Sequence, residues 1–153
     1  MMEESTKFIL ESNDLKEGEY IQDKFTPQGA DLVPNLTWRN IPDKTKSFAL
    51  CVEDPDAPNG TFYHWLVMNI PFDRSSIDNN NVHGKELFNS WGQTKYKGPS
   101  PPGKHAHRYF FKMFALSCDK INAHDIESFL KEVSKNKIEE ASLMVKYKRQ
   151  DHH

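Results

Sequence analysis

The segment from residue 95 to residue 116 restricts the possible folds of this chain more than any other. Its first half contains Pro99, Pro101 and Pro102, which lack a backbone donor and have a fixed φ, so it can form neither a helix nor a central strand. Its second half, 109–116, is aromatic and apolar with one charge, which is typical of a buried strand. A stiff loop therefore leads directly into a strand, and polar groups at that junction are candidates for a binding pocket.

Two polar aromatic side chains stand at this junction. His107 and Tyr109 are two residues apart in the strand that we predict over 107–116, so they should point to the same face of the sheet. Arg108 has the opposite parity, and we expect it outside the pocket in a structural ion pair.

A second pair of predicted strands, 47–53 and 63–70, flanks the proline-rich turn 54–60. The residues of each strand that share one parity are Phe48, Leu50, Val52 and Asp54 in the first, and His64, Leu66, Met68 and Ile70 in the second. If these are the inward faces, one carboxylate and one imidazole lie at the mouth of an apolar layer.

These two stretches resemble the signature regions of the phosphatidylethanolamine-binding protein family, also called the Raf kinase inhibitor protein family. The first is Asp-Pro-Asp-Ala-Pro at 54–58, followed by His64, and the second is Gly-Pro-Ser-Pro-Pro-Gly at 98–103, followed by His-Arg-Tyr at 107–109. The resemblance covers roughly residues 7 to 149, and the short chain is similar to the bacterial and archaeal branch. Asn-Ser-Trp-Gly at 89–92 is similar to an Asn-Asp-Phe-Gly element of the family but differs from it at its two central residues.

The chain is expected to form a single domain over residues 1–153, with flexible ends at 1–6 and 150–153. Its 153 residues, 37% of them hydrophobic and 27% charged, suit one globular core. The pattern alone predicts a mostly β domain with some α, and the resemblance implies a large antiparallel sheet packed on a smaller one. Apolar residues at helical spacing predict a helix over 125–135, followed by a short helix at 137–140 and then a terminal strand.

The predicted pocket combines polar groups with a stiff apolar rim. We expect its lining to be Asp54, Ala57, Pro58, His64, Gly98, Pro101, Pro102, His107 and Tyr109. In this hypothesis Asp54 orients His64 or accepts a proton from a ligand, the imidazoles and Tyr109 donate hydrogen bonds to an anion, and the prolines provide shape. Asp56 is expected to bond the backbone of its own turn.

Two other kinds of site use the same residue types. His105 and His107 with Asp54 and His64 could bind a metal, but no paired acidic second shell is evident and the resembling family is not metal-dependent. Asp54, His64 and Ser100 supply the residue types of a hydrolase triad, but Ser100 lies between prolines and no Gly-x-Ser-x-Gly turn is present. We therefore expect no metal, no cofactor and no catalysis.

The sequence favours a non-enzymatic binding module for small anionic groups, such as a phospholipid head group, a phosphorylated side chain or a nucleotide phosphate. The alternative is a regulator such as a kinase or protease inhibitor, whose pocket recognises a side chain of its partner. A formal net charge of −2 indicates no general attraction to nucleic acid, and the apolar runs are too short to span a bilayer. We expect a cytoplasmic protein, and the resemblance makes a homodimer plausible.

Overall fold

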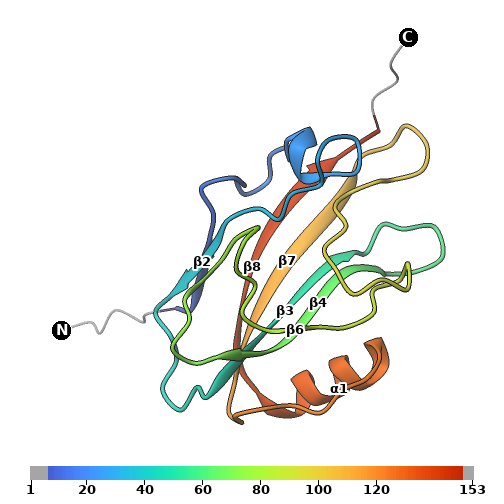
Figure 1. The fold of residues 1–153 in the computed structure, drawn as a ribbon. Helices are drawn as coiled ribbons and strands as arrows, with labels where there is room; N and C mark the ends of the chain where they lie inside the picture. The colour runs from blue at the N-terminus through green and yellow to red at the C-terminus, as the bar shows by residue number, and fades with distance from the viewer. Residues whose placement is uncertain (1–6, 150–153) are drawn as a thin grey trace.

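The computed structural model describes residues 7–149, so the predicted flexible ends at 1–6 and 150–153 lie outside the described residues. Two antiparallel sheets form the fold (Figure 1). The larger has the order β6 (Lys85–Glu86), β4 (Phe62–Pro71), β3 (Ser47–Asp54), β7 (His107–Leu116) and β8 (Lys137–Tyr147). The smaller has the order β1 (Ile9–Glu11), β2 (Leu36–Arg39) and β5 (Ser76–Ile77). A 3₁₀ turn, η1, spans Asp23–Phe25, and the α-helix α1 spans Ile126–Asn136.

The large sheet is buried on both faces. One hydrophobic cluster joins it to the small sheet and includes Phe48, Phe111 and Trp38. A second cluster fills the space between its other face and α1, and includes Leu66 and Phe129. This double burial explains why β3 and β7 read as nearly continuous apolar runs rather than as alternating ones.

The mostly β fold predicted from the sequence is confirmed, and β7 has the predicted beginning and end. The short helix predicted at 137–140 is wrong. Those four residues begin β8, which follows α1 without an intervening loop and pairs with the whole length of β7. Pairing with the neighbouring strand therefore outweighs the helix propensity of this charged segment.

The predicted inward face of β4 is only partly correct, because two β-bulges change its parity. The pairing jumps from Phe48–Ile70 to Leu50–Val67, which leaves one extra β4 residue where Asn69 has a φ of 59°. It jumps again at His64. As a result Leu66 and Met68 face α1, whereas Trp65, Val67 and Ile70 face the small sheet.

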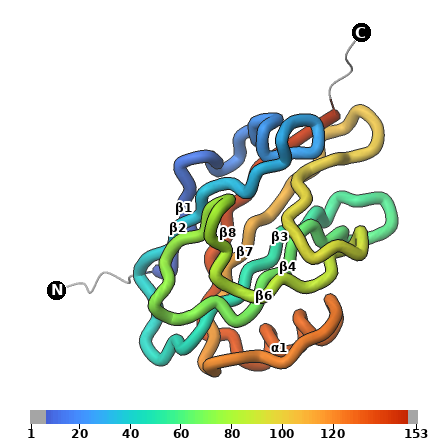
Figure 2. Tube along the Cα trace, in the orientation of Figure 1, coloured from blue at the N-terminus to red at the C-terminus, as the bar shows by residue number. Residues whose placement is uncertain are grey.

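The second bulge positions the site. Val52 pairs with Trp65 and Glu53 pairs with Tyr63, so His64 is the unpaired extra residue. A bulge re-aims the side chain of its extra residue, and here it lets His64 face the same side of the sheet as Asp54. The turn after β3 and the proline-rich loop before β7 lie side by side at this end of the sheet (Figures 1 and 2).

Candidate functional site

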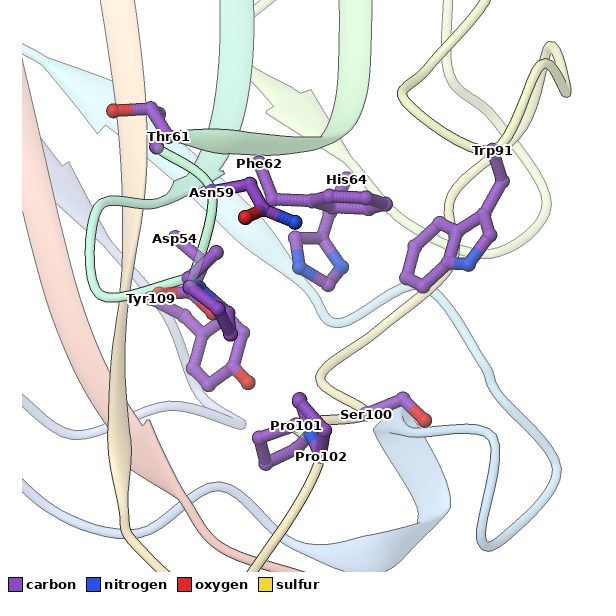
Figure 3. A pocket seen from close by; sticks show the side chains of 13 residues that line it. Asp54, Asn59, Thr61, Phe62, His64, Trp91, Ser100, Pro101, Pro102 and Tyr109 are labelled. Carbon is purple, nitrogen blue, oxygen red and sulfur yellow. The ribbon is translucent and has the colours of Figure 1, made fainter.

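A pocket of about 370 Å³ opens where β3 ends, β4 begins and β7 begins. Its lining consists of Asp54, Ala57, Pro58, Asn59, Gly60, Thr61, Phe62, His64, Trp91, Ser100, Pro101, Pro102 and Tyr109. Figure 3 shows Asp54, His64 and Tyr109 on one side of the cavity, with Pro101 and Pro102 facing them. Seven of the nine residues expected from the sequence therefore lie in the wall of one pocket, and Gly98 and His107 do not.

Asp54 is the last residue of β3, and its carboxylate is almost completely buried. One oxygen, Oδ1, accepts the backbone N–H of Asp56 at 2.8 Å, which fixes the turn that follows. The other, Oδ2, lies 2.7 Å from Nδ1 of His107. Each carboxylate oxygen can accept a further hydrogen bond, because a single partner leaves it a free lone pair.

His107 supports the site from behind and does not form part of the pocket wall. It is the first residue of β7, is buried, and pairs its Nδ1 with Asp54. The prediction that His107 and Tyr109 point to the same face is confirmed, since their rings stack on one face of β7 with centroids 6.4 Å apart. Only Tyr109 reaches the cavity, so the structure gives His107 the role of holding the Asp54 carboxylate.

His64 presents an acceptor to the pocket at neutral pH. Its Nδ1 lies 2.8 Å from the backbone carbonyl of Lys97, so this nitrogen must carry the proton and donate it. Burial lowers the pKa of the imidazole to about 4, and the carbonyls of Lys97 and Gly98 and the charge of Asp54 offset this only in part. The neutral ring therefore has a bare lone pair on Nε2. The expectation that His64 donates a hydrogen bond to an anion does not fit this tautomer.

Tyr109 supplies the donor. Its ring is fully buried and meets the edge of His64 at a centroid distance of 5.2 Å. Its hydroxyl is buried and has no hydrogen-bond partner within the described part of the chain. Burial, the nearby charge of Asp54 and the closeness of that carboxylate to the hydroxyl raise the pKa of the phenol far above its usual value, so it keeps its proton. Asp54 is thus a neighbour of the hydroxyl without the geometry of a hydrogen bond.

Gly98 acts through the loop rather than through the pocket. Its N–H donates to Oδ1 of Asp31 at 2.9 Å. A side chain at this position would collide with the carbonyl oxygen of Phe25 and press on the hydroxyl of Tyr96. Tyr96 in turn donates to that same carbonyl at 2.6 Å. The glycine thus allows the proline-rich loop to pack closely on the segment that leads to the small sheet.

Sequence reasoning missed the aromatic wall of the pocket. Trp91 meets Phe62 and His64 edge to face at centroid distances of 4.5 and 4.8 Å, and the ammonium of Lys97 lies 4.4 Å from the Trp91 ring. Asn89 holds this segment in place by accepting the N–H groups of Trp91 and Gln93. Two features of the sequence could have indicated these residues as part of the pocket wall. Residues 89–92 come shortly before the proline-rich loop, and residues 59–61 form a polar turn between two strands that both carry site residues.

Asp56 is structural, as expected, but its partner differs from the predicted one. It accepts the backbone N–H of Arg108 at 2.9 Å and bonds the guanidinium through both oxygens at 2.9 and 2.8 Å. These bonds to Arg108 lower the pKa of Asp56 to about 2. The pair ties the turn after β3 to the start of β7 outside the pocket, which confirms the predicted outward position of Arg108.

Comparison with known proteins gives the family. The model of the phosphatidylethanolamine-binding protein family matches residues 11–148. The chain belongs to this family. It is similar to a protein named UPF0098 protein from Aquifex aeolicus, at 43% identity over 117 residues that cover 72% of this chain and 68% of the relative. It is also similar to YbcL of Escherichia coli, at 35% identity over 137 residues that cover 77% of this chain and 73% of the relative.

The fold agrees with this assignment. The crystal structure of YbcL, described as a new member of the mammalian phosphatidylethanolamine-binding protein family, superposes with a TM-score of 0.88 at 30% identity. The superposition covers 94% of this chain and 99% of that one. Within residues 7–149, no group of three or more His, Cys, Asp or Glu residues is placed to hold a metal ion. Over the same residues, no helix is long and apolar enough to cross a membrane.

Proposed function

We propose that this chain is a non-enzymatic binding protein whose pocket receives a small oxyanion such as a phosphate monoester. The observation that carries the proposal is the hydroxyl of Tyr109, which is buried at the pocket with no partner among residues 7–149. A buried donor left unpaired costs about 1–3 kcal/mol. An acceptor oxygen of a bound ligand would remove that cost.

The shape and charge of the pocket agree with a small head group. A volume of about 370 Å³ is near the lower end of the range for ligand sites, and aromatic rings and prolines surround a few polar atoms. The Asp54 carboxylate lies 2.7 Å from Nδ1 of His107. The ammonium of Lys97 lies 4.4 Å from the ring of Trp91, which is part of the pocket wall. The pocket thus offers an anion both a donor and a nearby cation.

The arrangement of the same groups argues for binding rather than catalysis. A nucleophilic hydroxyl needs a base within hydrogen-bond reach. Ser100 is the serine of the pocket wall, and no hydrogen bond joins its hydroxyl to an imidazole within residues 7–149. Nε2 of His64 is the free nitrogen of that ring, and no hydroxyl is hydrogen-bonded to it within the described residues, while His107 directs its Nδ1 at Asp54.

Calorimetric titration with phenyl phosphate at pH 5.5 tests the proposal. Tyr109→Phe keeps the ring and removes the donor, so we expect its affinity to fall about tenfold, as the loss of one hydrogen bond implies. Tyr63→Phe is the matched control, because Tyr63 packs with the cluster on the opposite face of the sheet. The variant Tyr109→Phe should be at least as stable as the wild type without ligand, since it loses an unpaired hydroxyl.

The proposal is wrong if the wild-type protein binds no phenyl phosphate. It is also wrong if Tyr109→Phe and Tyr63→Phe bind it with equal affinity, because the orphan hydroxyl would then have no part in recognition.

A further inference from the structure

We propose that the pocket selects oxyanions that still carry a proton, such as the monoanion of a phosphate monoester, and rejects oxyanions that have none. This inference rests on the proposed function, since it assumes that the pocket binds an oxyanion, and it specifies which chemical form is bound. It follows from an imbalance among the buried polar side chains of the pocket wall, where the acceptors Asp54 and His64 outnumber the donor Tyr109. The other side chains with donors, those of Asn59, Thr61, Trp91 and Ser100, are exposed or half-buried at the rim.

The first acceptor is Nε2 of His64. The carbonyl of Lys97 can only accept a hydrogen bond, so it fixes the proton of the neutral imidazole on Nδ1. Figure 3 shows the His64 ring projecting into the cavity between Phe62 and Tyr109. The low pKa of the imidazole, about 4, means that this tautomer persists throughout the range from pH 5.5 to pH 8.

The second acceptor is the carboxylate of Asp54. It receives the N–H of Asp56 and faces Nδ1 of His107, and it retains acceptor capacity on both oxygens. Its negative charge would repel a bare anion at short range unless a proton lies between them. Both acceptors line the same cavity as the hydroxyl of Tyr109.

The other charges near the pocket do not provide a second donor at its floor. Arg108 is held by Asp56 outside the cavity, and neither of these residues is part of the pocket wall. Lys97 lies over Trp91, and its ammonium is 4.4 Å from that ring. His107 stands behind Asp54 and directs Nδ1 at the carboxylate.

A protonated phosphate satisfies this arrangement and its close analogues do not. The monoanion of a phosphate monoester has one P–OH donor for His64 or Asp54 and two unprotonated oxygens, one of which can accept from Tyr109. A sulfate monoester has the same shape and charge but no donor. A lone pair of its oxygen would therefore face the lone pair of His64 or Asp54, and the two would repel each other. The diester of an intact lipid head group also lacks a phosphate proton at neutral pH.

The experiment compares three pairs of measurements by calorimetry on the full chain. Phenyl phosphate and phenyl sulfate are titrated at pH 5.5, and each is titrated again at pH 8. O-phosphorylethanolamine and glycerophosphorylethanolamine are titrated at pH 5.5 to separate a free monoester from a lipid-derived diester. Phenyl sulfate does not titrate in this range, so the pH dependence of its binding reports any change in charge of the protein.

We expect phenyl phosphate to bind at least tenfold more tightly than phenyl sulfate at pH 5.5, and the monoester to bind more tightly than the diester. The second pKa of a phosphate monoester is about 6, so the monoanion fraction falls about 75-fold between pH 5.5 and pH 8. The affinity for phenyl phosphate should fall with it, after correction by the sulfate series.

Asp54→Asn replaces an acceptor by a possible donor, so we expect it to accept phenyl sulfate nearly as well as phenyl phosphate. Glu53→Gln is the matched control, because it removes the same negative charge from the residue next to Asp54. The Glu53 side chain pairs with Lys112 on the opposite face of the sheet. This variant should retain the wild-type discrimination. Equal affinity of the wild type for phosphate and sulfate, or tighter phosphate binding at pH 8, overturns the inference while the proposed function stands. Absence of binding by every anion overturns both.

Discussion

His64 lies in the pocket because of a single extra residue in β4. Trp65 and Val67 point toward the small sheet. Without the bulge between Tyr63 and Trp65, strict alternation would point His64 to the opposite face of the large sheet. The bulge places a buried imidazole next to Tyr109 and Trp91, at centroid distances of 5.2 and 4.8 Å. Burial of this side chain has a consequence for stability that can be measured.

We predict that His64 makes the protein less stable in acid. The pKa of His64 is about 4 in the folded protein and that of an ordinary histidine is 6.5, so the unfolded chain takes up a proton between these pH values and the folded chain does not. The contribution to stability is complete above pH 6.5 and is lost as the pH falls toward 4, up to about 3 kcal/mol. Urea unfolding between pH 4 and pH 7 measures it, and His64→Gln should flatten the curve.

The exposed residue His124 provides the control. His124→Gln removes an imidazole whose side chain is 83% exposed, so its curve should follow that of the wild type. If His64→Gln follows the wild type as closely, the imidazole is not held neutral by the fold.

At the scale of elements, the proline-rich loop is positioned by its contacts with the segment around η1. Gly98 donates to Asp31, and Tyr96 donates to the carbonyl of Phe25, which is the last residue of η1. The part of the pocket wall that Pro101 and Pro102 form therefore depends on contacts that lie outside the pocket.

We predict that Gly98→Ala disturbs both the fold and the site. The added methyl group meets the Phe25 carbonyl, and overpacking of this kind typically costs about 1–3 kcal/mol. Because the loop must shift, affinity for phenyl phosphate should fall even though Gly98 does not line the pocket. Denaturant unfolding and calorimetry measure the two effects. A variant with wild-type stability and affinity would show that the close packing of the loop is unnecessary.

The elements that the sequence predicted well are those with a long, uniform pattern. The aromatic run in 107–116 and the helical spacing in 125–135 specify their structures locally, and the observed elements begin and end within one residue of these ranges. The errors arise where pairing decides the outcome. The segment 137–140 joins β8 because β7 offers it a partner, and the faces of Leu66 and Met68 follow from bulges that the sequence pattern does not reveal.

The candidate site shows the same division. Asp54, Tyr109 and the prolines were predicted because residues at strand ends and in stiff loops have positions that follow from the local chain. The tautomer of His64 depends on the carbonyl of Lys97, 33 residues away, and the burial of His107 behind Asp54 depends on register between β3 and β7. Contacts of this range could not be read from one sequence.

At the scale of the whole molecule, the large sheet separates two cores. The pocket opens on the face that packs against the small sheet, and α1 covers the other face (Figure 1). Changes in the core beneath α1 should therefore alter stability without reaching the binding site.

We predict that Phe129→Ala destabilises the fold but leaves the affinity for phenyl phosphate unchanged. The Phe129 side chain is completely buried, and its truncation should cost about 3–5 kcal/mol. Urea unfolding gives the loss of stability, and calorimetry well below the unfolding midpoint gives the affinity. A parallel loss of both would show that the two faces of the sheet are coupled.

The protonation state of the bound phosphate tests the central claim most directly. The ³¹P chemical shift of phenyl phosphate distinguishes the monoanion from the dianion, and a titration from pH 5 to pH 8.5 with saturating protein gives the pKa of the bound group. If His64 and Asp54 both accept hydrogen bonds at the pocket, the bound phosphate should keep its proton above the free pKa of about 6. A bound pKa equal to or below the free value would contradict the account, because the pocket would then prefer the dianion.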